Sequence, residues 1–179
     1  GVRHPEAFHG KGKASPFFEG WYVKLVSADL SQRWAVIPGI FKGIDKADSN
    51  ERQSKDEAFI QVLDGSTGRS WFHSFDSSEF KAASDKFEVQ IGNNFFSETE
   101  VRLDLPQLQG TISITTPFVP WPVTLRSPGI MGWYGLVPFM ECFHGVVSLG
   151  HGLTGDLEIT DDSGQRRMVS FDGGRIEPP

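Results

Sequence analysis

The sequence predicts an all-β protein, built as an antiparallel barrel or sandwich with at most a short helical turn. The chain holds 15 Phe, 5 Trp and 20 Gly among 179 residues. Aromatic residues favour pleated, half-buried strands, and glycine favours turns. Short apolar runs bounded by turn signals recur along the chain, whereas helical periodicity is nearly absent. Only the stretch from Asp76 to Phe87 is compatible with a helical turn.

Strand-like runs are predicted at residues 17–27, 33–43, 57–65, 69–75, 86–92, 100–106, 108–116, 138–160 and 166–174. Turn signals at 64–69, 92–94 and 161–165 predict hairpins. Residues 42–57 are polar and aperiodic, which indicates an exposed loop. Four prolines within residues 115–132 exclude a regular central strand there. No internal repeat and no domain boundary is evident, so a single domain over 1–179 is expected.

Charge argues against a nucleic-acid partner. The net charge is −6 and the sequence pI is about 5.3. Binding of phosphates needs clustered Lys and Arg, and the basic residues of this chain are scattered.

Cysteine content and hydropathy favour a cytoplasmic protein. A single cysteine, Cys142, excludes an intramolecular disulfide and a cysteine-based zinc site. No apolar run approaches the roughly 18 residues of a membrane span. The first residues are polar and glycine-rich, unlike a signal peptide.

Strand alternation places a carboxyl group on an apolar face near the start of the chain. In "FFEGWYVKL", Glu19, Trp21 and Val23 share one face, and Tyr22 and Lys24 share the other. A second acid lies in "PFMECFHGVVSLGHGL", where Glu141 and His151 share one face and His144 points to the opposite one.

A buried carboxyl group supports two interpretations. In an apolar cavity its pKa rises, so that it can protonate an alkene or hold a phenol during ring closure. Alternatively, Glu19 or Glu141 pairs with a histidine, an arginine or a backbone amide and only stabilises the fold.

The histidines do not predict a metal site. His144 and His151 are seven residues apart, which directs them to opposite faces of one strand, and no third ligand follows from spacing. The first interpretation is that both histidines are structural and have satisfied hydrogen bonds. The second is that they contact a ligand. No phosphate-binding glycine loop, dinucleotide fingerprint or serine nucleophile elbow is present, so no cofactor is expected.

Several stretches together resemble the tocopherol cyclase family and its bacterial relatives. The segment "FFEGWYVKL" is similar to the Phe-Glu-Gly-Trp-Tyr-x-Lys signature near the start of that family, and "HPEAFHGKGK" resembles the lead-in to it. "FEVQIGNNFFS" resembles a central hairpin of the bacterial members, and residues 127–155 resemble a further family segment. The resemblance follows the chain in order over nearly its whole length.

The resemblance implies a lipocalin-like β-barrel, of the kind also found in carotenoid hydratases. It implies closure of a chroman ring on a prenylated hydroquinone without a redox cofactor. It also implies candidate site residues: Glu19 and Glu141 as acids, and Trp21, Tyr22, Trp133 and Tyr134 as pocket or rim residues. Apart from the resemblance, His144 and His151 are further candidate ligand-binding residues.

Family members continue beyond the equivalent of "SFDGG" into a second set of strands, whereas this sequence ends at "RIEPP". The chain therefore resembles the N-terminal half of the family, either as a naturally short relative or as one half of a two-barrel unit. The expected partners are an apolar small molecule, a membrane surface that supplies it, and either a second copy or a missing second half covering an apolar face.

Three functions remain open from the sequence. The first is a cyclase- or hydratase-like enzyme with a glutamic acid as proton donor. The second is a non-catalytic lipocalin-like carrier of a lipid or isoprenoid. The third is a structural half-domain whose interior is filled by its own side chains, as eight-stranded barrels often are.

Overall fold

The computed structural model describes residues 17–42, 56–115, 121–125 and 151–177, and this part of the chain is almost entirely antiparallel β-strand. The predicted all-β class is confirmed. One three-residue 3-10 helix, η1 (Ser77–Glu79), interrupts the strands within the stretch where a helical turn was expected. No helix among the described residues has the length and apolar character needed to cross a membrane.

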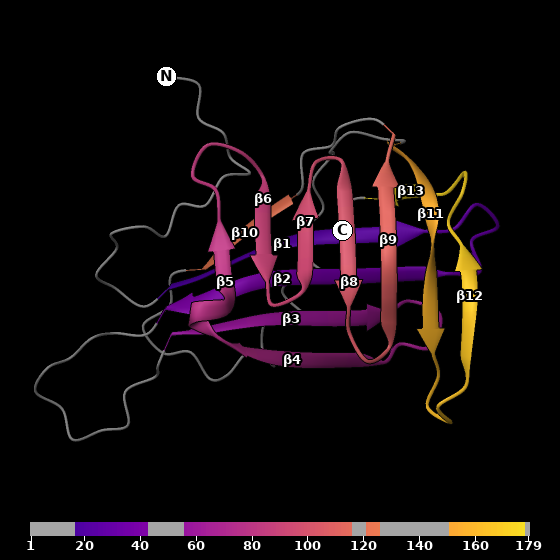
Figure 1. Ribbon diagram of the computed structural model, residues 1–179, viewed down its shortest axis with the longest axis horizontal. Coiled ribbons are helices and arrows are strands. Elements are labelled where there is room, and N and C mark those ends of the chain that lie inside the picture. Colours follow the sequence, from indigo (N-terminus) through magenta and orange to yellow (C-terminus); the bar gives the residue numbers. More distant parts are fainter. Residues whose placement is uncertain (1–16, 43–55, 116–120, 126–150, 178–179) are drawn as a thin grey trace, which may run out of the picture.

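The first layer is a four-stranded meander made by the first third of the chain (Figure 1). Its strands are β1 (Phe17–Val26), β2 (Arg33–Lys42), β3 (Glu57–Asp64) and β4 (Ser70–Asp76). The predicted loop at 42–57 thus begins at the end of β2 and ends at the start of β3, and its residues 43–55 lie outside the described part.

The second layer crosses the first in Figure 1 and follows it in the chain. It contains β5 (Phe80–Ala82), β6 (Glu88–Ile91), β7 (Asn94–Ser97), β8 (Glu100–Asp104), β9 (Leu108–Ile114), β11 (His151–Thr160) and β12 (Arg166–Ser170). Asp76 caps η1 at the corner between the layers, because its carboxylate accepts a hydrogen bond from the backbone N–H of Ser78.

Two short strands pair with β1, and one of them, β13, joins the two layers. The first half of β1 pairs with β10 (Trp121–Leu125), and its last residues pair with β13 (Arg175–Glu177), which also pairs with the start of β11. The hydrogen-bonded path therefore runs from β4 to β5 through both layers, and these two end strands do not pair with each other among the described residues. Closure into a barrel stays a prediction.

Of the proline-rich segment at 115–132, the structure describes only residue 115 and residues 121–125. Pro122 lies in β10, and β10 pairs only with β1 among the described strands, so it is not a central strand. Proline has no N–H to donate to a second neighbour, which restricts it to such positions. The three predicted hairpin turns connect β3 to β4, β6 to β7 and β11 to β12, and are confirmed.

The main core lies between the layers. The inward side chains of β1–β3 are Trp21, Val23, Leu25, Trp34, Val36, Ala58, Ile60 and Val62, and all are at most 3% exposed. They meet an equally apolar face of the second layer, including Phe96, Ile112 and Leu157. Burial of this apolar surface is the dominant stabilising contribution.

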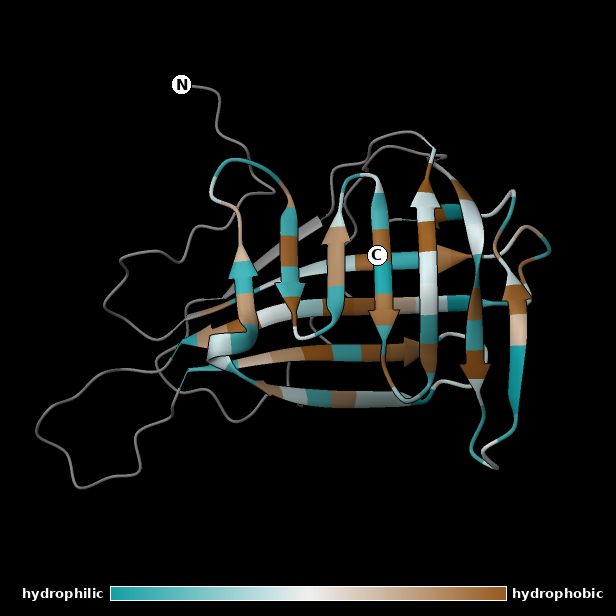
Figure 2. Cartoon of the chain, viewed as in Figure 1, coloured by the Kyte–Doolittle hydropathy of each residue, from teal (hydrophilic) through white to brown (hydrophobic). Residues whose placement is uncertain are grey.

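A second apolar cluster covers the opposite face of the first layer, and we call it the outer cluster. It consists of buried Phe18, Ile37 and Phe59 with partly buried Tyr22, Phe41, Leu63 and Phe72 against them. Antiparallel sheets commonly expose one polar face, so an apolar second face is unusual. In Figure 2, β3 is brown over most of its length, whereas strands of the second layer alternate brown and teal.

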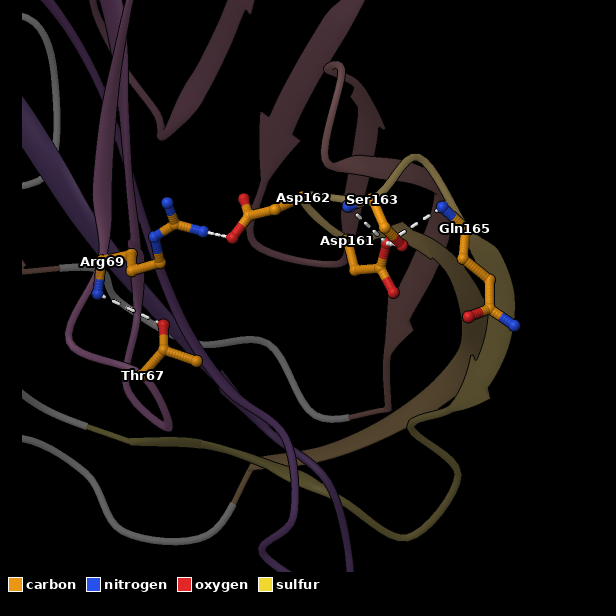
Figure 3. Close-up of polar contacts among 6 residues, drawn as sticks. All are labelled: Thr67, Arg69, Asp161, Asp162, Ser163 and Gln165. Atoms are coloured by element: carbon orange, nitrogen blue, oxygen red, sulfur yellow. Dashed lines mark hydrogen bonds and ion pairs between the residues drawn. The ribbon is translucent and has the colours of Figure 1, made fainter.

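Hairpin tips from the two layers meet beyond the edge strand β4. Arg69 at the β3–β4 turn pairs with Asp162 at the β11–β12 turn (Figure 3). Asp161 shapes that second turn by accepting hydrogen bonds from the backbone N–H groups of Ser163 and Gln165. Both partners of the ion pair are at least half exposed, at 50% and 64%, so the pair contributes little to stability.

Candidate functional site

Glu19 is buried inside the protein, as the strand alternation predicts. Its side chain is 0% exposed, and it lies on β1 two residues before Trp21. Its backbone partners are Ile40 on β2 and Thr124 on β10. The strand register continues from Ile40 to Ala58 and then to Phe75, so the side chains aligned with Glu19 across the first layer are apolar. A carboxyl group in such surroundings is the most distinctive chemical feature of the described interior.

Trp21 packs beside Glu19 against two aromatic rings from the β5–β6 region. Its ring centroid lies 6.4 Å from that of Phe80, with the planes nearly parallel at 17°, and 6.0 Å from that of Phe87. Trp21 is 0% exposed and Phe87 is 2% exposed. The indole therefore faces protein rings on the same side as Glu19.

Tyr22 lies on the other face of the same strand. It packs on the outer cluster and is only partly buried. The structure thus brings Glu19 and Trp21 together and separates Tyr22 from both, so these three predicted residues cannot surround one ligand.

The other predicted site residues are not covered by the described part of the chain. Glu141, Trp133, Tyr134 and His144 lie outside it. His151 is the first residue of β11, where its backbone pairs with Ile176, and its side chain is not described.

His73 forms a polar contact between the layers, with a partner 34 residues away in the sequence. It lies on β4 opposite Ile60, and its Nε2 donates to Oε1 of Gln107 at 3.0 Å. Gln107, 6% exposed, belongs to the β8–β9 turn. Burial holds the pKa of His73 below its usual value of 6.5, and the hydrogen bond to Gln107 partly opposes that shift. The alternation Trp71, His73, Phe75 was the available signal for an inward histidine.

We expect mild acid to destabilise the protein through His73. A lowered folded-state pKa means that the unfolded chain binds a proton first, so the free energy of unfolding falls as pH drops through 6.5 toward the folded pKa. Urea unfolding at about pH 7.5 and about pH 5.5 should show this loss. The variant His73→Gln should show a smaller difference between the two conditions. An equal difference in both proteins would contradict the assignment.

Gln61 is the second residue that sequence analysis missed. It is 2% exposed on the outer face of β3, and its amide Nε2 has no hydrogen-bond partner among the residues that the structure describes. A lone polar residue within the apolar run "FIQVL" was the signal that could have revealed it.

No three His, Cys, Asp or Glu side chains in the described ranges are grouped closely enough to hold a metal ion. Comparison with protein-family models, with curated proteins and with solved structures gives no match to this chain. Its function is therefore inferred from its residues.

Proposed function

We propose that this protein is a tocopherol cyclase-like, lipocalin-type barrel that binds an apolar small molecule of the prenylated quinol or isoprenoid class. The observation that carries the proposal is the fully buried Glu19 beside Trp21, within the segment that resembles the family signature. A buried acid among aromatic and aliphatic side chains suits an apolar substrate, because such a site excludes competing water.

In the catalytic form of this proposal, Glu19 is the general acid for ring closure. Its carboxyl group donates a proton to the trisubstituted double bond of the prenyl chain, which leaves a tertiary carbocation. The phenol oxygen of the same molecule attacks that carbon and forms the ring C–O bond. The phenolic proton then leaves and returns to the carboxylate, so no oxidant, reductant or cofactor is consumed.

A packed interior favours a second candidate, the half-domain without catalytic activity. Side chains of both layers fill the space from Trp21 to Leu25, including Phe87 and Phe96. A non-catalytic carrier, which binds its ligand and leaves it unchanged, is intermediate between the enzyme and the half-domain. Peripheral membrane contact and association with a second half or a second copy belong to the same proposal, since each would deliver or enclose an apolar ligand.

The deciding experiment is incubation with a geranylgeranyl hydroquinone, followed by native mass spectrometry and product analysis. For the enzyme we expect a chromanol product of unchanged mass, formed at least about 100-fold more slowly by Glu19→Gln. The matched control is Glu98→Gln, in the β7–β8 turn, which should retain full activity. Bound but unchanged ligand would support the carrier, and absence of binding would contradict the proposal.

A further inference from the structure

The two layers are joined in different ways on the two sides of the first layer. On the β1 side the connection is a backbone ladder, because β13 pairs with the end of β1 and also with the start of β11. On the β4 side, apart from the packing of the core, the described contacts between the layers are made by turns and side chains, and β4 pairs with no second-layer strand among the described residues. The β4 side is therefore the weaker connection, since isolated contacts break more easily than a cooperative ladder.

Three turns of the second layer meet β4 one after another, and we call this line of contacts the seam. In order along β4 and the residue before it, the β6–β7 turn meets Phe75, the β8–β9 turn meets His73 and the β11–β12 turn meets Arg69. The first contact is a close approach of Gly92, where an added Cβ would lie 3.3 Å from Cε1 of Phe75. The second is a hydrogen bond and the third is an ion pair, so only the third depends on two full charges.

The seam is anchored at its Phe75 end and not at its Arg69 end. Beyond Phe75 the chain passes through η1 directly into β5, and Asp76 caps that helix. The N–H of Gly92 also donates to the backbone oxygen of Glu79 at 3.2 Å. At the other end Arg69 belongs to an exposed hairpin turn, and its contact with the second layer is the ion pair with Asp162 (Figure 3). Separation of the layers therefore begins most easily at Arg69.

Tryptophan side chains lie directly behind the Arg69 end of the seam. Cζ of Arg69 is 5.8 Å from the ring centroid of Trp71. The ring of Trp71 is in turn 6.2 Å from that of Trp34, with 22° between their planes. Trp71 is partly buried against the main core and Trp34 belongs to that core. Movement of Arg69 away from Asp162 would therefore uncover the core at this end.

We propose that the seam is a salt-sensitive opening of the protein, in which the layers separate at the Arg69 end while β13 keeps them joined on the β1 side. The Arg69–Asp162 ion pair holds the seam closed, and salt weakens exposed ion pairs of this kind. Access of water to the core behind Trp71 then depends on ionic strength. This device does not rest on the function proposed above, because Glu19 aligns across the first layer with Phe75, at the anchored end.

Two buried thiols can report where the protein opens. Val62 on β3 and Val23 on β1 lie in one register row, which Val36 and Trp71 complete. Both are 0% exposed; Val62 is beside β4, and Val23 immediately precedes the residues that pair with β13. In the full chain carrying Cys142→Ala, the variants Val62→Cys and Val23→Cys each place one small thiol in the core. We expect an aromatic disulfide reagent to label the first thiol about 10-fold faster or more, because local opening exposes it before global unfolding does.

Charge variants test the ion pair itself. Arg69→Glu should speed labelling of the Val62→Cys thiol about 2-fold or more, because it removes an attraction and adds a repulsion. Adding Asp162→Arg to that variant should restore the original rate. Raising NaCl from about 0.02 M to about 0.5 M should speed labelling when the native pair is present and slow it in Arg69→Glu, because salt screens attraction and repulsion alike. The matched control is Arg166→Glu on β12, which loses an exposed pair with Glu158 and should leave the rate unchanged.

Equal labelling of the two thiols would show that the protein opens only as a whole, and would overturn the proposal. Faster labelling of the Val62→Cys thiol that responds neither to Arg69→Glu nor to salt would overturn it too. A second readout keeps the native core: acrylamide quenching of tryptophan fluorescence should increase with salt more in the wild type than in Trp71→Phe, and an equal increase would contradict the seam. All of these measurements are made without ligand, so the hydroquinone assay of Glu19→Gln decides the proposed function separately.

Discussion

Replacing Trp21 with alanine is expected to lower the free energy of unfolding by about 3–5 kcal/mol, the range for truncation of a fully buried aromatic side chain. Trp21 is 0% exposed and contacts the rings of Phe80 and Phe87, which come from the second layer. Its removal would leave a cavity where the layers meet, and close-packed interiors fill such cavities only in part.

Urea unfolding followed by circular dichroism measures this loss. A domain of this size should also melt roughly 10 °C lower. The control is Met168→Ala on β12, where the side chain is 63% exposed and the expected change is within about 0.5 kcal/mol. A loss below about 1 kcal/mol for Trp21→Ala would show that this indole does not join the layers.

Gly155→Ala is the second substitution with a large expected effect. It should lower the free energy of unfolding by about 3 kcal/mol or more. Gly155 has a φ of +121°, which side chains of L residues rarely adopt, and an added Cβ would collide with the backbone oxygen of Thr111 and lie 3.3 Å from Cα of Ile112. The clash is with backbone, so no side-chain rotation relieves it.

Gly155 lies where β11 changes its pairing partner. β11 pairs with β13 at its start and with β12 from Asp156 onward, and Gly155 precedes that change of partner. Its N–H donates to Oδ1 of Asp172 at 2.7 Å, and its carbonyl accepts from the N–H of Phe171 at 2.9 Å. Both bonds fix the connection between β12 and β13.

Thermal unfolding of Gly155→Ala and of Gly68→Ala separates the cost of the backbone conformation from the cost of the steric clash. Gly68 has a φ of +74°, and a Cβ there would meet nothing within 4 Å. We expect Gly68→Ala to lower the free energy of unfolding by about 1–2 kcal/mol, because only the backbone conformation is unfavourable there. Equal losses at the two positions would mean that β9 and β11 move apart without cost, contrary to the packing described here.

Local patterns predicted the strands well where alternation or turn chemistry was strong. The faces of β1 follow from the sequence, with Glu19 and Trp21 inside and Tyr22 on the other side. The three-residue strands β5 and β13 were missed, since so few residues carry no measurable period. The short strand β10 was missed because its proline suppresses the strand signal.

For the candidate site, the sequence alone determined which residues share a face and that a carboxyl group would point inward at Glu19. The tertiary structure decided what those faces meet. It shows that β1 has three neighbouring strands and that His73 contacts Gln107, 34 residues away in the sequence. It also shows that the second face of the first layer carries an apolar cluster beside Gln61, whose amide Nε2 has no hydrogen-bond partner within the described part of the chain. Periodicity is a property of neighbours along the chain. Partners distant in sequence are chosen by the burial and hydrogen bonding gained when the layers pack, which no local pattern records.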